Sequence, residues 1–428
     1  MPRRVRAAAS ANASIWFCEE CSMRHAGALV SRSDCTRCGA PRGPSLASPP
    51  VLESSESANH GTVSPGIAAD GHAMSAAAAT ALHGAQSAVG CQIGPSPAER
   101  PDLGSIFEHY PCDEEGYAVA IDPCDAEAIR HAMDRYGVVV AHVLPAADCA
   151  AGADEIFADC RVPRDGPPCA WEDEHWPNPG RFLYGWRAEC RTAKGPAAMR
   201  NRTHPMVHQT FQALFNGERR LWVSADTYGI MRPTSCLAFP TPGGGIEIRD
   251  RLDWRWELKM HWDCNPWALQ DEISNGHPTM FQGLIALVDC PEETGSFLAV
   301  PGCTRYFHYR FPKQPQNVGL KDGVVTGKAY VPDKSVLRSF TQRFSLRAGD
   351  LLVWDSRTAH ANFANTGQNF RLVQFVQMMP AIEALEARHG YWARQLITEA
   401  DIEGMGLSLN ARRLLALDDW GDEEMENG

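Results

Sequence analysis

Hydrophobic residues recur at changing intervals along this chain, and the interval predicts the type of each element. Residues 125–136 place apolar side chains at the spacing of a helix that ends before Gly137. An uninterrupted apolar run follows at 138–144 and stops at Pro145, which is typical of a buried strand. Residues 146–159 return to the helical pattern. The globular part of the chain is therefore expected to open with a helix, a strand and a second helix.

The pattern shortens further along the chain. Residues 204–215 predict a helix and residues 220–224 a strand. From there to Pro380 the sequence consists mostly of short strands broken by Gly and Pro turns. We therefore expect a mainly β fold, a cupin-like jelly roll (double-stranded β-helix) with flanking helices. Two more helices are expected at 382–399 and 409–417.

Three stretches lack hydrophobic periodicity. Residues 44–104 are rich in Ala, Ser, Pro and Gly and contain few large apolar side chains, so they cannot bury enough surface to offset chain entropy. We expect a disordered linker there. Residues 160–202 are rich in Trp, Pro, Gly and Arg, and we expect a long loop that borders the functional site. The acidic residues 421–428 are expected to fray.

Composition narrows the class of protein. The 428 residues are 44% hydrophobic, which is enough for a sizeable core. No apolar run approaches the roughly 20 residues of a membrane helix, and no signal peptide is recognisable after the first Met. The net charge of -12 argues against a broad nucleic-acid-binding surface, because such surfaces are built from clustered Lys and Arg. We expect a soluble protein of the cytoplasm or nucleus with no membrane partner.

The cysteines suggest a separate small module. There are 15 of them, and without a secretory signal they are expected to be core residues or metal ligands rather than disulfides. Two Cys-x-x-Cys pairs stand at ligand spacing: Cys18, Cys21, Cys35 and Cys38. Four thiolates can bind structural Zn(II) and fold a segment that is too short for its own core. The alternative is reduced cysteines without metal.

With Trp16 before these pairs and Gly39-Ala40-Pro41 after them, residues 14–43 resemble a RanBP2-type zinc finger. The loop between the pairs is longer than usual, and His25 stands where that family often has Asn. The resemblance implies a partner that is RNA or ubiquitin. The arginines of the segment are compatible with nucleic-acid binding, and equally with an ordinary charged surface.

The candidate chemistry begins at a His-x-Asp pair, His261 and Asp263. Side chains alternate faces along a strand, so the imidazole and the carboxylate point the same way while Trp262 points away. A second imidazole would complete the 2-His-1-carboxylate face that holds Fe(II) and leaves positions open for oxygen and a co-substrate. A lone His-x-Asp is common by chance. A candidate for the second imidazole is His360, which ends an apolar run after the turn at Gly349-Asp350.

The order of the surrounding motifs is more specific than the pair itself. After the pair come an apolar run ending in Asp289, a turn with Gly295, then Val300-Pro301-Gly302, Gly349-Asp350, His360 and Arg371. This order resembles the phytanoyl-CoA dioxygenase family of Fe(II)/2-oxoglutarate oxygenases. The resemblance runs roughly from Gly116 to Trp420, within a domain expected at 105–420. Cys303 departs from the family, which commonly has Ser there, and is not expected to affect the chemistry.

The resemblance implies roles for individual residues. His261, Asp263 and His360 would bind iron, and Arg371 would bind the distal carboxylate of 2-oxoglutarate through its bidentate fork. Taken alone, an Arg on a strand is more often a partner in a surface salt bridge. Gln282 could donate to the keto acid or be an ordinary cross-strand partner. The implied reaction uses O2 to hydroxylate a small-molecule substrate while 2-oxoglutarate is decarboxylated to succinate, and the family does not specify the substrate.

Other residues are weaker candidates, and other functions remain as alternatives. Trp262 and Trp267 could wall the site or pack in the core, residues 355–357 could brace the loop before His360, and Thr304, Arg305 and His308 could meet substrate. A domain without turnover could serve as an adaptor for the finger, but the intact triad and Arg371 argue against it. Halogenation is disfavoured because Asp263 fills the place that a halide needs.

Overall fold

A computed structural model describes most of the chain after residue 102 and three short strands near its start. The described residues are 7–10, 13–18, 23–25, 103–172, 194–263, 265–310, 320–321, 324–325, 329–331, 333, 335–382 and 397–421. The chain divides into two compact units, residues 1–73 and residues 74–428. No helix in the described ranges is long and apolar enough to span a bilayer.

The first unit contains three short antiparallel strands. They are β1 (Ala7–Ser10), β2 (Ala13–Cys18) and β3 (Met23–His25), paired in that order. Cys18 ends β2, whereas Cys21, Cys35 and Cys38 lie outside the described residues. The zinc finger at 14–43 therefore stays a prediction. So does the linker at 44–104, of which only the first two residues of α2 (Leu103–Ile106) are described.

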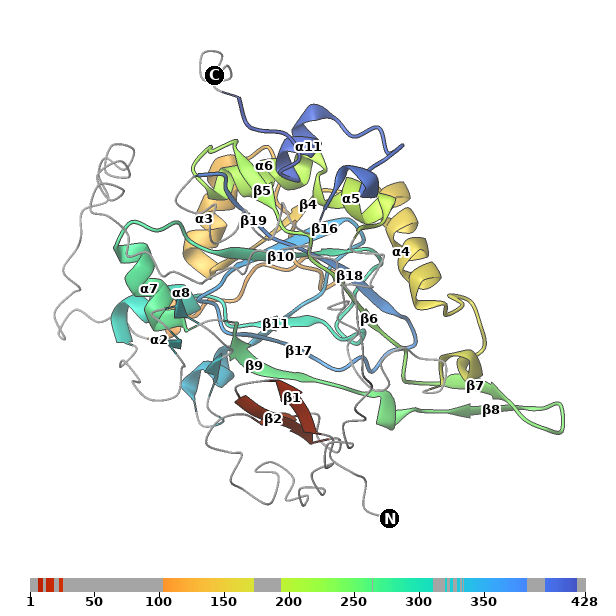
Figure 1. Ribbon diagram of the computed structural model, residues 1–428. Helices are drawn as coiled ribbons and strands as arrows, with labels where there is room; N and C mark the ends of the chain where they lie inside the picture. The colour runs from red at the N-terminus through yellow and green to blue at the C-terminus, as the bar shows by residue number, and fades with distance from the viewer. Residues whose placement is uncertain are drawn as a thin grey trace, which may run out of the picture. The chain divides into compact units, whose positions relative to one another are not determined.

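The second unit is built on two five-stranded sheets (Figure 1). In spatial order, the first contains β4 (Val138–His142), β16 (Asp350–Asp355), β10 (Phe281–Ala286), β18 (Arg371–Val376) and β6 (Tyr228–Met231). The second contains β14 (Ala329–Tyr330), β9 (Leu258–Trp262), β17 (His360–Asn362), β11 (Phe297–Ala299) and β15 (Gln342–Phe344). Every pairing within both sheets is antiparallel.

The route of the chain between the sheets identifies the architecture. From β9 onward, β10, β16 and β18 join the first sheet, while β9, β11, β14, β15 and β17 join the second. Strands that cross repeatedly between two packed antiparallel sheets form a jelly roll. The predicted mainly β fold is therefore confirmed. Three two-stranded pairs complete the strands: β5 (Leu221–Val223) with β19 (Met378–Pro380), β7 (Leu237–Pro240) with β8 (Ile246–Arg249), and β12 (Leu320–Lys321) with β13 (Val324–Val325).

Helices cover the first sheet and the ends of the roll (Figure 1). They are α3 (Ala126–Tyr136), α4 (Ala146–Cys160), α5 (Pro196–Arg202), α6 (Pro205–Leu214), α7 (Pro266–Ser274), α8 (Cys303–Arg310) and α11 (Leu409–Leu414). The predicted end of α3 is confirmed, because Gly137 adopts φ 67° and its N–H bonds back to the helix. Short 3-10 turns lie at Pro168–Trp171, Leu252–Trp254, Val336–Phe340 and Glu399–Asp401.

Three predicted elements differ from the structure. The expected loop at 160–202 contains a 3-10 turn and the helix α5, so that prediction is wrong in part, and residues 173–193 lie outside the description. The helix expected at 409–417 ends at Leu414. Most of the helix expected at 382–399 also falls outside the described residues, and its last residues, 397–399, are not α-helical.

The core is formed mainly by the first sheet, which is buried on both faces. Val139, Val140, Leu351, Leu352 and Val353 are all 0% exposed, because helices lie on one side of these strands and the second sheet on the other. This explains why β4 and β16 are continuous apolar runs rather than alternating ones. Three neighbouring strands of this sheet, β16, β10 and β18, carry side chains that face the interior of the roll.

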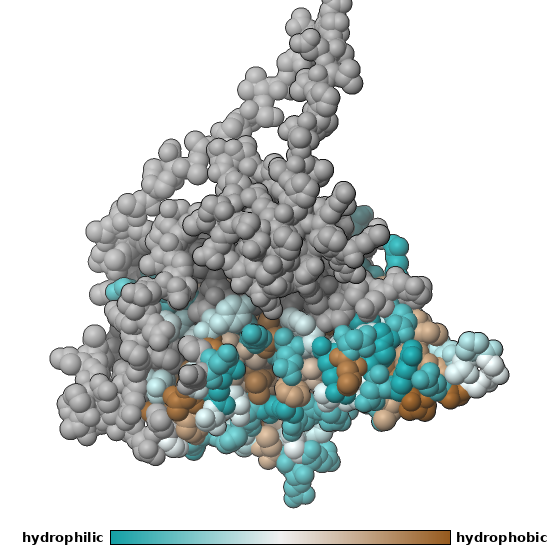
Figure 2. Space-filling view, turned by 90° about the horizontal axis from the view of Figure 1, so that it is seen from below, coloured by the Kyte–Doolittle hydropathy of each residue, from teal (hydrophilic) through white to brown (hydrophobic). Residues whose placement is uncertain are grey.

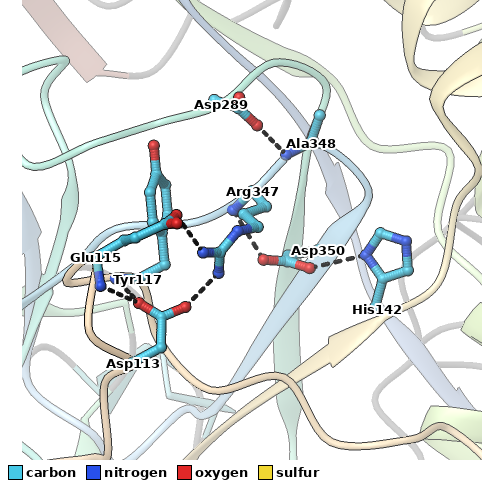
Figure 3. Close-up of polar contacts among 8 residues, drawn as sticks. All are labelled: Asp113, Glu115, Tyr117, His142, Asp289, Arg347, Ala348 and Asp350. Carbon is cyan, nitrogen blue, oxygen red and sulfur yellow. Dashed lines mark hydrogen bonds and ion pairs between the residues drawn. The ribbon is translucent and has the colours of Figure 1, made fainter.

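The turn before β16 is held by a polar network (Figure 3). Gly349 has φ 93°, and a Cβ there would lie 2.2 Å from the carbonyl oxygen of Leu144, so only glycine fits. The Asp350 carboxylate accepts the Arg347 backbone N–H at 2.8 Å and lies 3.0 Å from Nδ1 of His142. The Arg347 guanidinium pairs with two carboxylates, one of them Glu115 at 2.7 Å. The Gly-Asp motif thus stabilises a turn.

Candidate metal centre

The fold brings His261, Asp263 and His360 to one point. His261 lies on β9 and is paired directly with His360 at the start of β17, while Asp263 comes just after β9. Their ligand atoms all lie within 4.8 Å of one another. Nε2 of His261 is 3.2 Å from Oδ1 of Asp263, and Nε2 of His360 is 3.3 Å from Oδ2. The predicted grouping of these side chains is therefore present in the structure.

Backbone carbonyls fix the orientation of both imidazoles. Nδ1 of His261 lies 2.8 Å from the carbonyl oxygen of Lys259, and Nδ1 of His360 lies 3.0 Å from that of Thr358. A carbonyl oxygen can only accept a hydrogen bond, so Nδ1 carries the hydrogen in both rings. In the neutral imidazole the lone pair is then on Nε2, which faces the carboxylate. This arrangement is the one that metal-binding histidines use.

The Nε2 atoms and the carboxylate oxygens would all be acceptors in that state. Acceptor atoms repel each other at the 3.2 and 3.3 Å that separate each Nε2 from the carboxylate. The arrangement is stable only when a positive charge lies among these atoms, either a proton on each imidazole or a metal ion. Burial raises the pKa of Asp263, but hydrogen bonds and charge from the two imidazoles, when these are protonated, outweigh it and hold the pKa below its usual value. Asp263 is therefore ionised. Two imidazole nitrogens and one carboxylate oxygen fit a divalent transition metal such as iron.

The triad is enclosed rather than open. The side chains of His261 and His360 are 1% and 5% exposed, and that of Asp263 is 30% exposed. The rings of Phe297 and Trp354 lie 5.7 and 5.2 Å from the His360 ring. Water and ligands therefore reach the centre mainly past the carboxylate.

An ion pair holds the loop that precedes His360. Asp355, at the end of β16, accepts from the backbone N–H of Arg357 at 2.8 Å and from its guanidinium at 2.9 Å. Nε1 of Trp262 donates to the Arg357 carbonyl at 2.9 Å, which ties the loop to β9. The predicted bracing role of this segment is consistent with these contacts. Trp262 is 2% exposed and packs edge-on to Trp267, so it packs in the core in addition to anchoring this loop.

The register of the first sheet shows where Gln282 points. Residues directly opposite each other in a sheet share a face. Gln282 is paired with Trp354, whose ring lies beside His360, so Gln282 faces the interior of the roll. Its amide nitrogen donates to the Ser356 hydroxyl at 3.1 Å. Gln282 therefore lies on the side of the sheet that faces the triad and also supports the same loop as Asp355.

The same argument places Arg371. Phe375 is paired with Leu284, which shares the inward face with Gln282, and Arg371 lies four residues before Phe375 on β18. With a period of two, Arg371 also faces inward. On the opposite face, Gln374 donates to the Ala198 carbonyl of α5 at 2.8 Å. Arg371 is 1% exposed, so the alternative of a surface salt bridge is wrong.

The contacts of the three remaining candidate residues do not indicate a role in the site. Thr304, Arg305 and His308 lie on α8, and Arg305 forms an ion pair with Glu108 at 3.6 Å. The side chain of His308 is outside the description. Among the described contacts, none joins these residues to the triad.

Asp226, a carboxylate with a raised pKa, was not singled out from the sequence. It lies in the turn between β5 and β6, where Ser224 donates its N–H to the Gln377 carbonyl at 2.8 Å. The carboxylate accepts the Thr227 N–H at 2.8 Å. Burial raises the pKa of Asp226, although the Thr227 N–H and the charge of Arg202 lower it in part.

Comparisons with known proteins agree with the site. Residues 252–373 match the model of the phytanoyl-CoA dioxygenase (PhyH) family, and this range contains the whole triad and Arg371. A Dictyostelium discoideum protein named "Putative phytanoyl-CoA dioxygenase" is 25% identical over 298 residues, which cover 62% of this chain and 78% of that protein. The Ava biosynthesis cluster protein O of Aspergillus versicolor is 24% identical over 226 residues, covering 50% and 64%. These matches show that this chain is similar to proteins of the phytanoyl-CoA dioxygenase family, with residues 252–373 as the part that matches the family model.

Solved structures with a partial likeness to this chain include the epimerase SnoN in complex with Fe3+, alpha ketoglutarate and nogalamycin RO. Its TM-score is 0.36 and its sequence identity is 18%. The likeness covers 61% of this chain and 85% of the SnoN chain.

Proposed function

We propose that this protein is an Fe(II)- and 2-oxoglutarate-dependent dioxygenase that hydroxylates a small organic substrate with O2 and releases succinate and CO2. The observation that carries the proposal is the orientation of the triad, in which both Nε2 atoms converge on the Asp263 carboxylate. The family match over the same residues supports it. The sequence and the fold leave the substrate open.

The residues of the centre have distinct roles in this proposal. His261 and His360 would bind iron through Nε2, and Asp263 would bind it through a carboxylate oxygen. Bound iron would supply the reduction of O2, at positions that three protein ligands leave free. Because two neutral imidazoles and one carboxylate leave a single net positive charge on an Fe(II) site, an anionic keto acid is attracted to it.

Arg371 would select the co-substrate. A guanidinium that is 1% exposed on the inward face of β18 requires an anion or polar groups around it. The distal carboxylate of 2-oxoglutarate is a planar partner for its fork of N–H donors. Gln282, on the same inward face, would contribute a polar group beside the keto acid. Phe297 and Trp354 would exclude water next to His360.

The test is an anaerobic titration followed by turnover. Adding Fe(II) and then 2-oxoglutarate should produce the metal-to-ligand absorption band of the ternary complex, and admitting O2 should release succinate. His142→Ala is a matched control. His142 also contacts an aspartate, but that aspartate is Asp350 at the start of β16, away from the triad. Absence of the band in the wild-type protein under metal-saturating conditions would contradict the proposal.

The amino-terminal segment is a separate proposal. We propose that Cys18, Cys21, Cys35 and Cys38 bind one Zn(II), with RNA or ubiquitin as the partner of the module. We expect one zinc ion per chain in the wild type. Cys35→Ser should lose this zinc and keep the iron centre intact. Equal zinc content in both proteins would refute it.

An adaptor without turnover is the alternative function, and it predicts no succinate release.

A further inference from the structure

The hairpin formed by β7 and β8 ends in an open strand. The two strands form a sheet of their own at one side of the molecule (Figure 1, right). Within the described part of the chain, β8 pairs with β7 and with no other strand. An open edge strand can pair with a further strand, and proteins commonly protect such edges.

The two faces of the hairpin differ. Leu237 and Phe239 are each 5% exposed, and the guanidinium of Arg249 lies 4.0 Å from the Phe239 ring, so this face is covered. On the other face Ile246 is 72% exposed and Ile248 is 62% exposed. Figure 2 shows hydrophobic residues at the end of the molecule where Figure 1 places the hairpin. Exposed apolar side chains that gather in this way mark an interaction surface.

The backbone of these isoleucines also faces outward. Thr241 donates its N–H to the Gly245 carbonyl at 2.9 Å, which marks a hydrogen-bonded pair next to the loop. Hydrogen-bonded and non-hydrogen-bonded pairs alternate along an antiparallel ladder. The next hydrogen-bonded pairs are therefore Glu247 with Phe239 and Arg249 with Leu237. Ile246 and Ile248, which alternate with them, therefore direct their N–H and C=O groups to the open edge.

The sequence of β8 is complementary to itself. If two copies pair antiparallel about a two-fold axis at Ile248, then Ile248 faces the same residue of the second copy, and Glu247 faces Arg249 across the axis in both directions. Two ion pairs thus flank one apolar contact. A register centred on Glu247 would place two carboxylates opposite each other, which is unfavourable. Charge complementarity therefore selects one register.

We propose that β8 is a homodimer interface at which two copies of this chain join their hairpins into a four-stranded antiparallel sheet. A two-fold axis through Ile248 is the closed symmetry that most homodimers use. The contact involves one short strand from each copy, so it is smaller than the standard interface of about 1,600 Å² and the dimer should be concentration-dependent.

Sedimentation velocity of the full chain over a wide concentration range tests the proposal. The mass should rise from the 47.0 kDa of the monomer toward twice that value. Ile248→Lys places two ammonium groups on the axis and should weaken dimerisation at least about tenfold. The control is Leu409→Lys, which changes a 56% exposed leucine on α11 and should dimerise like the wild type.

A mixing experiment separates the interface from misfolding. Glu247→Arg and Arg249→Glu should each weaken self-association, because each places like charges opposite each other across the axis. An equimolar mixture of the two variants should form a heterodimer, because the two arginines of one chain then face the two glutamates of the other. A wild type that stays monomeric at every concentration, or Ile248→Lys that matches it, would overturn the proposal. So would a mixture that gains no association.

Discussion

The two ends of β16 use the same residue types for different purposes. At its start, the carboxylates around Arg347 have a cation supplied by the chain itself (Figure 3). At its end, Asp355 and Arg357 form an equally closed pair, but the loop beyond them leads to His360. The imidazole of His360, together with that of His261, faces the carboxylate of Asp263.

The difference lies in where the positive charge comes from. A guanidinium stays protonated at any physiological pH, so the network at Arg347 is complete by itself. Imidazoles with Nδ1 bonded to carbonyls present lone pairs instead, so the second cluster needs a proton or a metal ion from outside. The first arrangement stabilises a turn and the second can bind a cofactor. Substitutions at the two ends should therefore have different consequences.

Removing a member of the triad should have the largest effect. His261→Ala, Asp263→Ala and His360→Ala should each abolish succinate release, and a double variant should be no worse than a single one, because ligands of one metal act as a unit. Asp263→Gly opens a coordination position without bulk and should retain weak binding of Fe(II) and 2-oxoglutarate while losing hydroxylation. If His360→Ala kept the ternary band and the wild-type rate, the second imidazole would lie elsewhere, for example at His308.

Removing Arg371 should affect the co-substrate more than the metal. Arg371→Ala deletes one partner of a buried charge-assisted pair, which typically costs about 2 to 5 kcal/mol, or roughly 30- to 5,000-fold in the Kd for 2-oxoglutarate. The affinity for Fe(II) should change little. Titration of the absorption band measures both. Arg347→Ala, in the closed network, is the control and should leave the keto-acid affinity unchanged. Equal affinity in the wild type and Arg371→Ala would exclude the role.

Removing the ion pair between Asp355 and Arg357 should weaken iron binding without removing a metal ligand. Arg357→Ala leaves the Asp355 carboxylate buried without its guanidinium and loosens the loop before His360. Residues that orient metal ligands typically contribute about 10- to 100-fold in metal affinity. The Kd for Fe(II) should rise by that factor, and the melting temperature of the metal-free protein should fall. Unchanged Fe(II) affinity beside a lowered melting temperature would show that the ion pair stabilises the fold only.

Replacing Asp350, at the start of β16, should change how stability depends on pH and should leave metal binding unchanged. Burial raises the pKa of Asp350, although its bonds with His142 and the Arg347 N–H lower it in part. A carboxyl whose pKa is higher in the folded state contributes stability at low pH, and this contribution is lost as pH rises through the folded value. Asp350→Asn should flatten the stability curve on the acidic side, with the Fe(II) affinity of the wild type. An unchanged pH profile in a denaturant titration series would contradict this assignment.

The sequence determined much of the fold because local patterns were strong. The helix ending at Gly137 and the buried runs of β4 and β16 needed only periodicity and the conformational freedom of one glycine. The helix α5 was missed, although Pro196 at its first position is a local signal of a helix start. Its first N–H groups, from Ala197 and Ala198, are capped by the Glu155 carboxylate at 2.8 and 3.1 Å, and Glu155 precedes Ala197 by 42 positions. A cap supplied over such a distance leaves no local signal.

The candidate site divides in the same way. The spacing of His261 and Asp263 and the order of the later motifs were enough to propose the triad and Arg371. Only the tertiary structure placed His261 directly opposite His360, because strand register depends on the whole sheet. It also decided that Arg371 faces inward, since this depends on the pairing of strands that are distant in sequence. Periodicity is a property of the local sequence, whereas the facing of side chains across two sheets arises from packing, which no local pattern encodes.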